Sequence, residues 1–319
     1  MNSMVRRFLV AAFLLLACVV AQAQPAQTYP DRPIRIIVPY PPGGGTDTLT
    51  RLVSKYMSES VKQPIIVENR PGADARIGMD VVMKAAPDGY TLLAIAAGPL
   101  NDDNMKSFVP IALFAAPAYL LVVNPSVKAN SVQELVALAK EQPGKLAYGS
   151  TGGGAASHLS TELFKAMTDT DMLHVPYKGV GNAVTDLLGG HVQLMIAPPQ
   201  AVMPQVKAGS LRALAVTSPR RMPFAPDIPT IAESGVPGYE SVGWFGLVAP
   251  AGVPRDIITK LNAEIVRILQ LPDVRQRLLE LGAEPARTTP EEFADFIRRD
   301  NAKWAKLIRE KGIVIENTK

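Results

Sequence analysis

The chain has 319 residues, of which 33 are lysine or arginine, 29 are aspartate or glutamate and one is cysteine. Its basic residues are scattered singly, without runs that alternate with aromatic residues, and this pattern argues against a nucleic-acid-binding protein. The length is enough for two domains of ordinary size.

The first 23 residues predict a cleavable secretory signal. Arg6 and Arg7 precede an apolar run over 8–20, and Ala21-Gln22-Ala23 is the small-x-small pattern that signal peptidases cut. The apolar run is too short for a convincing membrane span. We therefore expect cleavage between Ala23 and Gln24 and a mature protein in the periplasm.

The single cysteine, Cys18, lies within this signal. A lipid anchor at Cys18 is the less favoured alternative, because Leu16 is bulky and the apolar residues continue past the cysteine. After cleavage the chain has no thiol or disulfide and depends on its core alone. Without Arg6 and Arg7, 31 basic and 29 acidic residues remain, a net charge of +2.

Residues 34–47 predict an anion site. A short apolar strand over 34–38 runs through three prolines into Gly43-Gly44-Gly45, and either Thr46 or Asp47 caps the helix that follows. Glycines let the backbone approach a ligand closely, and a helix N-terminus offers free N–H groups and the positive end of the helix dipole. A glycine-rich turn that only connects the strand and the helix is the alternative.

Strands and helices alternate through the first part of the chain. Strands are expected over 34–38, 65–69 and 90–96, with helices after the first glycine loop and over 77–86. This βαβαβ order predicts a parallel sheet covered by helices. Apolar runs over 108–114 and 119–123 come next, and then a helix over 131–141 that opens with a capping box.

Residues 145–157 repeat the design of the first loop. A strand over 145–149 runs into Ser150-Thr151-Gly152-Gly153-Gly154 and then a helix over 157–167. Neither glycine loop has the spacing of a nucleotide-binding motif, and neither contains a lysine or arginine. Two such loops suggest the two walls of one cleft.

The remaining elements continue this alternation. Strands are expected over 172–176, 192–197 and 211–217, with helices over 180–188 and 201–207. They are followed by a proline-rich surface excursion over 219–237, a strand over 242–249 and three helices over 254–269, 272–281 and 290–311.

Ordered motifs along the chain carry a family resemblance. They are Pro39-Tyr-Pro-Pro-Gly-Gly-Gly-Thr-Asp47, Glu68-Asn-Arg-Pro-Gly72, Ala86-Pro-Asp-Gly-Tyr-Thr-Leu-Leu93, Tyr148-Gly-Ser-Thr-Gly-Gly-Gly154, His174-Val-Pro-Tyr-Lys-Gly179, Arg212-Ala-Leu-Ala-Val-Thr217, Gly235-Val-Pro-Gly-Tyr239 and Trp244-Phe-Gly-Leu247. In this order they resemble the extracytoplasmic solute receptors of tripartite tricarboxylate transporters, the Bug family, over essentially the whole mature chain.

The resemblance implies an α/β fold with two lobes, like the type II periplasmic binding proteins. Each lobe would be a mostly parallel sheet covered by helices, and two crossover strands would join the lobes. Lobe I would hold 24–123 and 247–319 and lobe II 124–246, with crossovers near Val123 and Gly246. The lobes would close on a small organic carboxylate, without a cofactor, and a monomer would deliver it to integral-membrane transporter subunits.

Three features depart from the family's usual pattern. Gly72-Ala-Asp-Ala-Arg76 is a bulkier and charged version of a glycine-rich turn, and the segment between Ala96 and Phe108 is shorter than usual. Leu194-Met-Ile-Ala-Pro-Pro199 lacks an aspartate that often follows this strand. Since that acid is absent and cannot pair with an ammonium group, we expect an unaminated organic acid rather than an amino acid.

The expected ligand contacts come from the two loops, the turn after the strand over 192–197 and the return crossover. They are Tyr40, Gly43, Gly44, Gly45, Thr46, Asp47, Ser150, Thr151, Gly152, Gly153, Ala155, Ser157, His158, Ala197, Pro198 and Trp244.

Several of these residues also have a structural interpretation. Tyr40 fits the family's aromatic lid or a core position. Asp47 and Ser157 could cap their helices instead. His158, like the other two histidines, fits a structural role, and Trp244 could pack at the hinge rather than line the pocket.

Enzymatic functions are less favoured. Neither Gly-x-Ser-x-Gly nor His-Glu-x-x-His occurs, and the histidines lack the spacing of a metal site. A triad of Ser150, His158 and Asp47 is conceivable, but the glycines beside the serine give no fixed nucleophile turn. A receptor that reports ligand occupancy to a membrane signalling partner is a further alternative that the sequence does not separate from transport.

Overall fold

The computed structural model describes residues 29–313 except 74, 153, 178 and 281. The expected cleavage site at Ala23 and Gln24, the lipidation candidate Cys18 and the ligand-binding candidate Gly153 lie outside the described residues. Among the helices that are described, none combines the length and the apolar character needed to cross a membrane.

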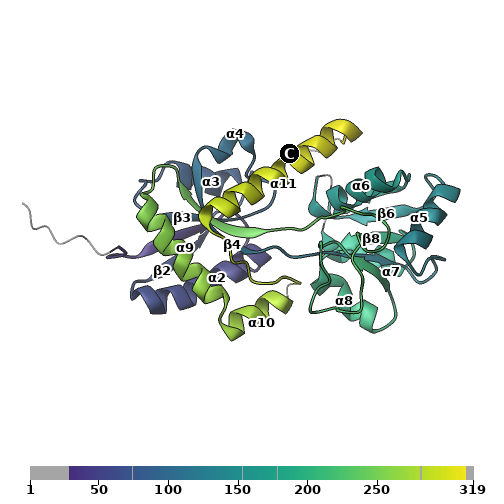
Figure 1. Cartoon of the computed structure of the whole chain (residues 1–319), viewed down its shortest axis with the longest axis horizontal. Coiled ribbons are helices and arrows are strands. Elements are labelled where there is room, and N and C mark those ends of the chain that lie inside the picture. Colours follow the sequence, from purple (N-terminus) through teal and green to yellow (C-terminus); the bar gives the residue numbers. More distant parts are fainter. Residues whose placement is uncertain (1–28, 74, 153, 178, 281, 314–319) are drawn as a thin grey trace, which may run out of the picture.

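Two lobes make up the described chain, and each is built on a five-stranded sheet (Figure 1). The strand order is β2-β1-β3-β10-β4 in lobe I and β7-β6-β8-β5-β9 in lobe II. Their bounds are β1 (Ile34–Val38), β2 (Ile65–Asn69), β3 (Thr91–Ala96), β4 (Phe108–Ala115), β5 (Leu120–Val123), β6 (Ala147–Ser150), β7 (Leu173–Pro176), β8 (Leu194–Ala197), β9 (Arg212–Val216) and β10 (Phe245–Pro250). Only β10 in the first sheet and β5 in the second run against their neighbours, so the expected two-lobed, mostly parallel α/β fold is confirmed.

Helices cover both faces of each sheet (Figure 1). Lobe I carries α2 (Gly45–Val61), α3 (Arg76–Met83), α4 (Asp102–Met105), α9 (Arg255–Leu269), α10 (Pro272–Glu280) and α11 (Pro290–Lys311), and lobe II carries α5 (Val132–Glu141), α6 (Ala156–Thr168), α7 (Val180–Leu188) and α8 (Pro199–Lys207). Successive residues of β1 show the two faces: Ile36 packs in the cluster with α2 and α9, while Ile37 packs in the cluster with α3 and α11. A strand buried on both faces is typical of a parallel sheet.

Strand direction places both glycine loops on the edges where the lobes face each other. β4 leaves its sheet at the carboxyl end to enter lobe II, and β1, β2 and β3 run in the same direction as β4, so their carboxyl ends share that edge. β5 enters lobe II at its amino end and runs opposite to β8, which is parallel to β6. The loops after β1 and β6 therefore face one another across the junction of the lobes.

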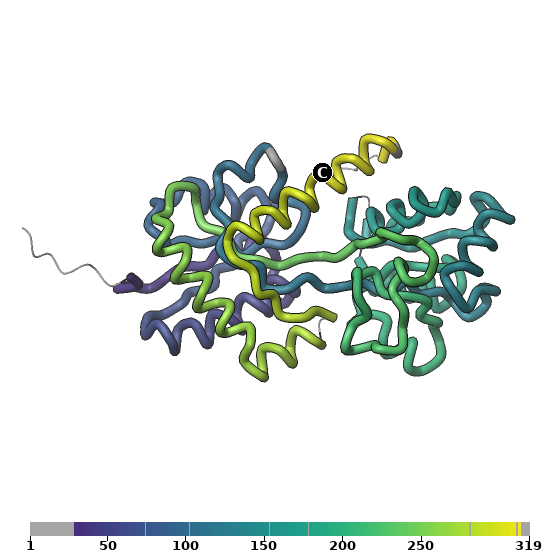
Figure 2. Tube along the Cα trace, in the orientation of Figure 1, coloured from purple at the N-terminus to yellow at the C-terminus, as the bar shows by residue number. Residues whose placement is uncertain are grey.

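Two chain segments, 116–119 and 241–244, cross between the lobes side by side (Figure 2). Ala118 and Val242 form an antiparallel bridge, and Gly243 N–H donates to Pro117 O at 3.0 Å. Assigning 120–123 to lobe I was wrong, since β5 pairs with β8 and β9. An apolar run suits either sheet, and only strand pairing decides which sheet takes it.

The segment over 219–237 also differs from the expectation of a surface excursion. It lacks named helices and strands, but Thr230, Ile231 and Val236 are buried against lobe II. Ile231 N–H donates to Val216 O at 3.0 Å. A proline-rich composition predicts irregular backbone, and it does not by itself predict exposure.

Candidate functional site

The first glycine loop ends in a helix without a side-chain cap. α2 begins at Gly45 with Gly44 as its N-cap, so the prediction that Thr46 or Asp47 caps this helix was wrong. A glycine at the N-cap has no oxygen to offer to the first N–H groups of the helix. Gly43 and Gly44 are exposed, which leaves this end of α2 accessible to an anion.

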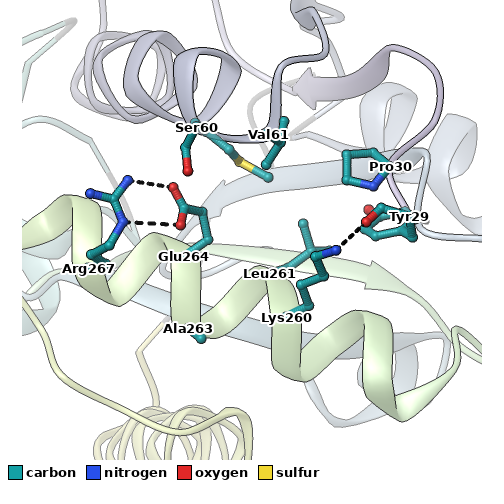
Figure 3. Close-up of a pocket in the computed structure, with 10 residues that line it drawn as sticks. Tyr29, Pro30, Ser60, Val61, Lys260, Leu261, Ala263, Glu264 and Arg267 are labelled. Carbon is teal, nitrogen blue, oxygen red and sulfur yellow. Dashed lines mark hydrogen bonds and ion pairs between the residues drawn. The ribbon is translucent and has the colours of Figure 1, made fainter.

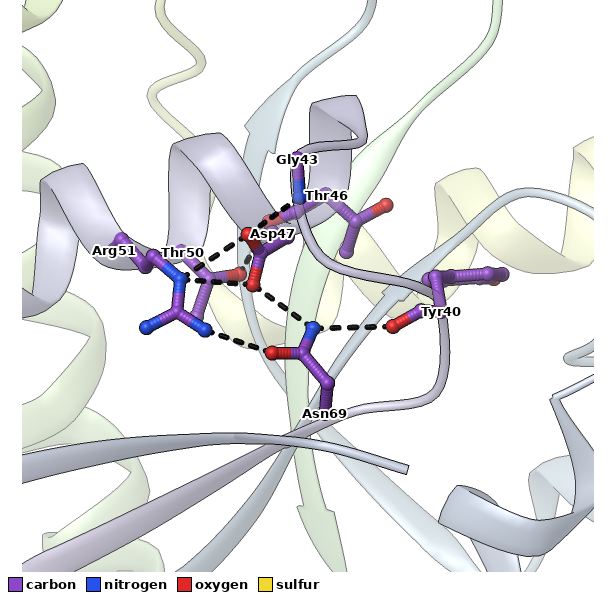
Figure 4. Close-up of polar contacts among 7 residues, drawn as sticks. All are labelled: Tyr40, Gly43, Thr46, Asp47, Thr50, Arg51 and Asn69. Carbon is purple, nitrogen blue, oxygen red and sulfur yellow. Dashed lines mark hydrogen bonds and ion pairs between the residues drawn. The ribbon is translucent and has the colours of Figure 1, made fainter. Parts of the chain in front are cut away.

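The carboxylate of Asp47 is bound to neighbouring groups of the protein, and these hydrogen bonds hold the first loop in place (Figure 4). Its carboxylate accepts hydrogen bonds from Gly43 N–H at 2.9 Å, Asn69 Nδ2 at 2.9 Å and Arg51 Nε at 3.0 Å. Asn69 also donates to Tyr40 O at 3.0 Å. The side chain of Thr46 is buried and points away from this cluster.

Charge pairing keeps this part of the site compatible with an anion. Burial works to raise the pKa of Asp47, but hydrogen bonds from Arg51, Gly43 and Asn69 outweigh it and lower that pKa below its usual value. Asp47 is therefore ionised at neutral pH, and Arg51 offsets its charge. Sequence analysis did not predict this role of Arg51 and Asn69, although Asn69 stands in a motif that carried the family resemblance.

The second glycine loop also leads into a helix without a side-chain cap, but different residues hold its backbone. α6 begins at Ala156 with Ala155 as N-cap and no side-chain cap, so Ser157 does not cap it. The Ser157 hydroxyl instead accepts a hydrogen bond from Thr151 N–H at 2.9 Å and lies 3.1 Å from the Thr151 hydroxyl. Both glycine loops thus lead into helices whose N-termini lack side-chain caps, a feature that they share with α3, α7, α8 and α9, whereas Ser131 and Thr289 cap α5 and α11.

Ser150 and His158 lie beneath the second loop. Ser150 is fully buried and His158 is 6% exposed, so neither reaches a ligand in this structure. Ser150 Oγ lies 2.6 Å from His174 Nε2, and His158 Nδ1 accepts a hydrogen bond from Gly154 N–H at 3.0 Å. The conceivable triad is therefore not assembled: Ser150 pairs with His174 rather than His158, and Asp47 is held in the other lobe.

Of the remaining predicted contacts, Tyr40 and Pro198 are half-buried, whereas Ala197 and Trp244 are buried. The hydroxyl of Tyr40 accepts a hydrogen bond from Ala96 N–H at 3.2 Å, and its half-buried ring remains a candidate lid. Ala197 is buried at the end of β8, while half-buried Pro198 is the N-cap of α8, another helix without a side-chain cap. Trp244 is 1% exposed, so it packs at the hinge rather than lining a pocket.

Trp244 belongs to the core of lobe I. Its Nε1 donates to Asp300 Oδ2 at 3.1 Å, and its ring meets Phe293 edge-on at 5.6 Å. Asp300 and Phe293 both lie on α11, which extends from lobe I toward lobe II (Figure 1). α11 therefore holds the lobe I end of segment 241–244, through which the chain returns from lobe II.

A cavity of about 560 Å³ lies away from the loops, between α2 and α9 (Figure 3). Its charged rim is internally paired: Lys260 Nζ donates to Tyr29 O, and Arg267 forms two hydrogen bonds with Glu264. A cavity whose charges already have partners offers a ligand little electrostatic gain. The chemistry therefore favours the glycine loops as the site. Within the described part of the chain, no group of three histidine, cysteine, aspartate or glutamate side chains could hold a metal ion.

Comparison with known proteins identifies the family. The model of the tripartite tricarboxylate transporter family receptor matches residues 49–313. The chain belongs to this family. Protein BugT of Bordetella pertussis is 37% identical over 321 residues, which cover 97% of this chain and 98% of BugT. A protein encoded in the tcbD-tcbE intergenic region of Pseudomonas sp. strain P51 is 39% identical over 315 residues, covering 96% and 94%.

Solved structures of similar receptors have the same fold. Rpa4515 of R. palustris, solved with adipate, is 36% identical with a TM-score of 0.74, covering 90% of this chain and 99% of Rpa4515. MatC of Rhodopseudomonas palustris, solved with malate, is 31% identical with a TM-score of 0.69, covering 88% and 100%. A solute-binding protein from Polaromonas reaches a TM-score of 0.80 at 31% identity, covering 89% and 100%. The family resemblance read from the sequence motifs is confirmed.

Proposed function

We propose that this receptor captures a small organic carboxylate between its two lobes and delivers it to the integral-membrane subunits of a tripartite tricarboxylate-type transporter. The observation that carries the proposal is that both glycine loops lie on the facing edges of the lobes and lead into helices without side-chain caps. Each helix end offers roughly half a positive charge, so two of them match one carboxylate. The adipate and malate bound to the two similar receptors support this ligand class.

Export and delivery complete the proposal. The protein reaches the periplasm through the signal over residues 1–23 and acts there as a monomer. Transport is favoured over reporting to a signalling partner because the matching family model is that of a transporter receptor.

Ligand binding is tested by thermal unfolding of protein that has been unfolded, stripped of ligand and refolded. A carboxylate at 100 times its dissociation constant adds about 2.7 kcal/mol to the free energy of unfolding. We expect stabilisation by adipate or malate and none by the diamide of adipate, which has the same length without charge. Aspartate is the matched control for malate, because it replaces the hydroxyl with an ammonium group, and it should bind more weakly. A protein stabilised by no carboxylate of a broad panel would contradict the proposal.

Ligand should also bring the lobes together. A single small anion can reach the N-termini of α2 and α6 at once only when the two edges converge, and 116–119 and 241–244 are the segments about which they can turn. Small-angle scattering is expected to give a smaller radius of gyration with saturating ligand than without it. Equal radii in the two states would show that binding needs no hinge motion.

A further inference from the structure

Two histidines form a stacked pair beneath the second glycine loop. Tyr148 of β6 and His174 of β7 are partners in the parallel register. His158, which lies on α6, stacks its ring on that of His174. The rings of His158 and His174 are 4.0 Å apart and within 10° of parallel, and Tyr148 stacks on His174 at 4.9 Å. These three rings lie next to Ser150, Gly152 and Gly154 of the second glycine loop.

Each imidazole uses one nitrogen to hold the loop. His174 Nε2 contacts the Ser150 hydroxyl at 2.6 Å, and Gly152 N–H lies 3.2 Å from that same oxygen. Gly154 N–H donates to His158 Nδ1 at 3.0 Å. Ser150 and Gly152 are thus tied to one ring and Gly154 to the other, so the two rings together hold the described backbone of the loop.

This arrangement requires Nδ1 of His158 to be unprotonated and disfavours charge on both rings at once. A proton on Nδ1 of His158 would leave Gly154 N–H without its acceptor, and two imidazolium rings 4.0 Å apart would repel each other. Burial lowers the pKa of His174 to about 4, aided by the charge of His158, and burial likewise lowers the pKa of His158. The other titratable groups that face the pair are Tyr148 from β6 and Glu162 and Lys165 from α6, and Glu162 Oε1 accepts hydrogen bonds from both Tyr148 and Lys165.

We propose that His158 and His174 are positioning residues for ligand binding, a neutral pair that holds the second glycine loop in the conformation that receives the carboxylate. This inference rests on the function proposed above. It departs from the expectation that His158 touches the ligand, because the ring acts through Gly154. Because both folded-state pKa values lie below the ordinary value near 6.5, the held conformation is favoured above that pH and loses its advantage as the pH falls.

Two variants of His158 distinguish the effect of its hydrogen bond to Gly154 from the effect of its ring. In His158→Asn the amide oxygen can take the place of Nδ1 and accept from Gly154 N–H without titrating, whereas His158→Leu fills the space with no acceptor. With adipate as the probe at pH 7, we expect His158→Leu to bind about tenfold or more weakly than wild type, and His158→Asn to recover most of that loss. His191→Asn, which changes an exposed histidine outside the pair, should stay within about threefold of wild type.

The pH profile gives a result that a general loss of stability would not. The ratio of the wild-type to the His158→Asn dissociation constant cancels the protonation of adipate itself. We expect this ratio to be constant above pH of about 6.5 and to rise at lower pH, while the corresponding ratio for His191→Asn stays flat. A flat ratio for His158→Asn down to pH 4 would show that the proton on His158 is irrelevant to binding.

A measurement without ligand keeps the inference separate from the proposed function. In the NMR spectrum of the ligand-free protein, the amide signal of Gly154 should titrate together with His158, and His158→Leu should shift it while His174→Gln alters the signal of Gly152. If these amides do not respond, or if His158→Leu binds adipate as wild type does, the pair does not position the loop. If wild type binds no carboxylate but the amides respond, the loop-holding role stands and the proposed function fails.

Discussion

Replacing Gly44 by valine is expected to weaken carboxylate binding by about 100-fold or more, because a branched side chain at the N-cap blocks the approach of an anion to the first N–H groups of α2. Gly44 is the cleanest position for this experiment. Its φ of −72° is open to any residue, and a Cβ there would meet only Pro41 O, at an ordinary 3.8 Å. Gly43 has a φ of +87°, and a Cβ on Gly45 would lie 2.9 Å from the Phe245 ring, so substitutions there would disturb the fold as well.

The charge at this position provides a sharper comparison. Gly44→Asp and Gly44→Asn both supply the side-chain cap that α2 lacks, and each should leave the free energy of unfolding within a few tenths of a kcal/mol of wild type or slightly above it. Only the aspartate places a negative charge where the carboxylate sits, so it should bind more weakly than the asparagine variant. Calorimetric titration measures the affinities and thermal unfolding the stability. Tight binding by Gly44→Val would exclude the N-terminus of α2 as the anion site.

Replacing Asp47 by alanine is expected to lower the free energy of unfolding by about 2 to 3 kcal/mol. The carboxylate is 4% exposed, and its loss would leave Gly43 N–H without its acceptor and would remove one of the two acceptors of Asn69 Nδ2. Arg51 is half exposed and would regain water, which limits the cost. Because Gly43 precedes the N-cap of α2, the same change should weaken ligand binding by about tenfold or more, through the lost conformation of the loop.

The pH dependence identifies the charge on Asp47 as the cause. The folded-state pKa of Asp47 lies below its ordinary value, so its contribution is present above pH of about 4 and is lost as the pH falls through the folded pKa. Asp47→Asn keeps a hydrogen-bond acceptor but cannot ionise. Denaturant unfolding should therefore give a difference between wild type and Asp47→Asn that shrinks toward zero below pH 4. A constant difference at every pH would assign the effect to packing instead.

Most of the fold could be predicted from the sequence because its signals are local. Apolar runs of strand length, glycines and prolines between them, and capping residues such as Thr289 mark the elements wherever they lie in space. The two glycine loops are also local signals, since three consecutive glycines before a helical pattern can be read from the sequence alone. The motifs and their order then predicted the family, and with it the two-lobed architecture and the ligand class.

Contacts between distant segments were decided by tertiary structure. The sheet that β5 joins depends on pairing with β8 and β9, some 70 to 90 residues later, and nothing in Leu120–Val123 itself distinguishes the two sheets. Trp244 is a hinge residue because Asp300 of α11 accepts its N–H, a pairing without a sequence signal. His158 and His174 stack because the parallel register of β6 and β7 places His174 beside Tyr148, under α6. The sequence determined which residues could bind an anion, and only packing at long range determined which face the ligand and which hold the loops in place.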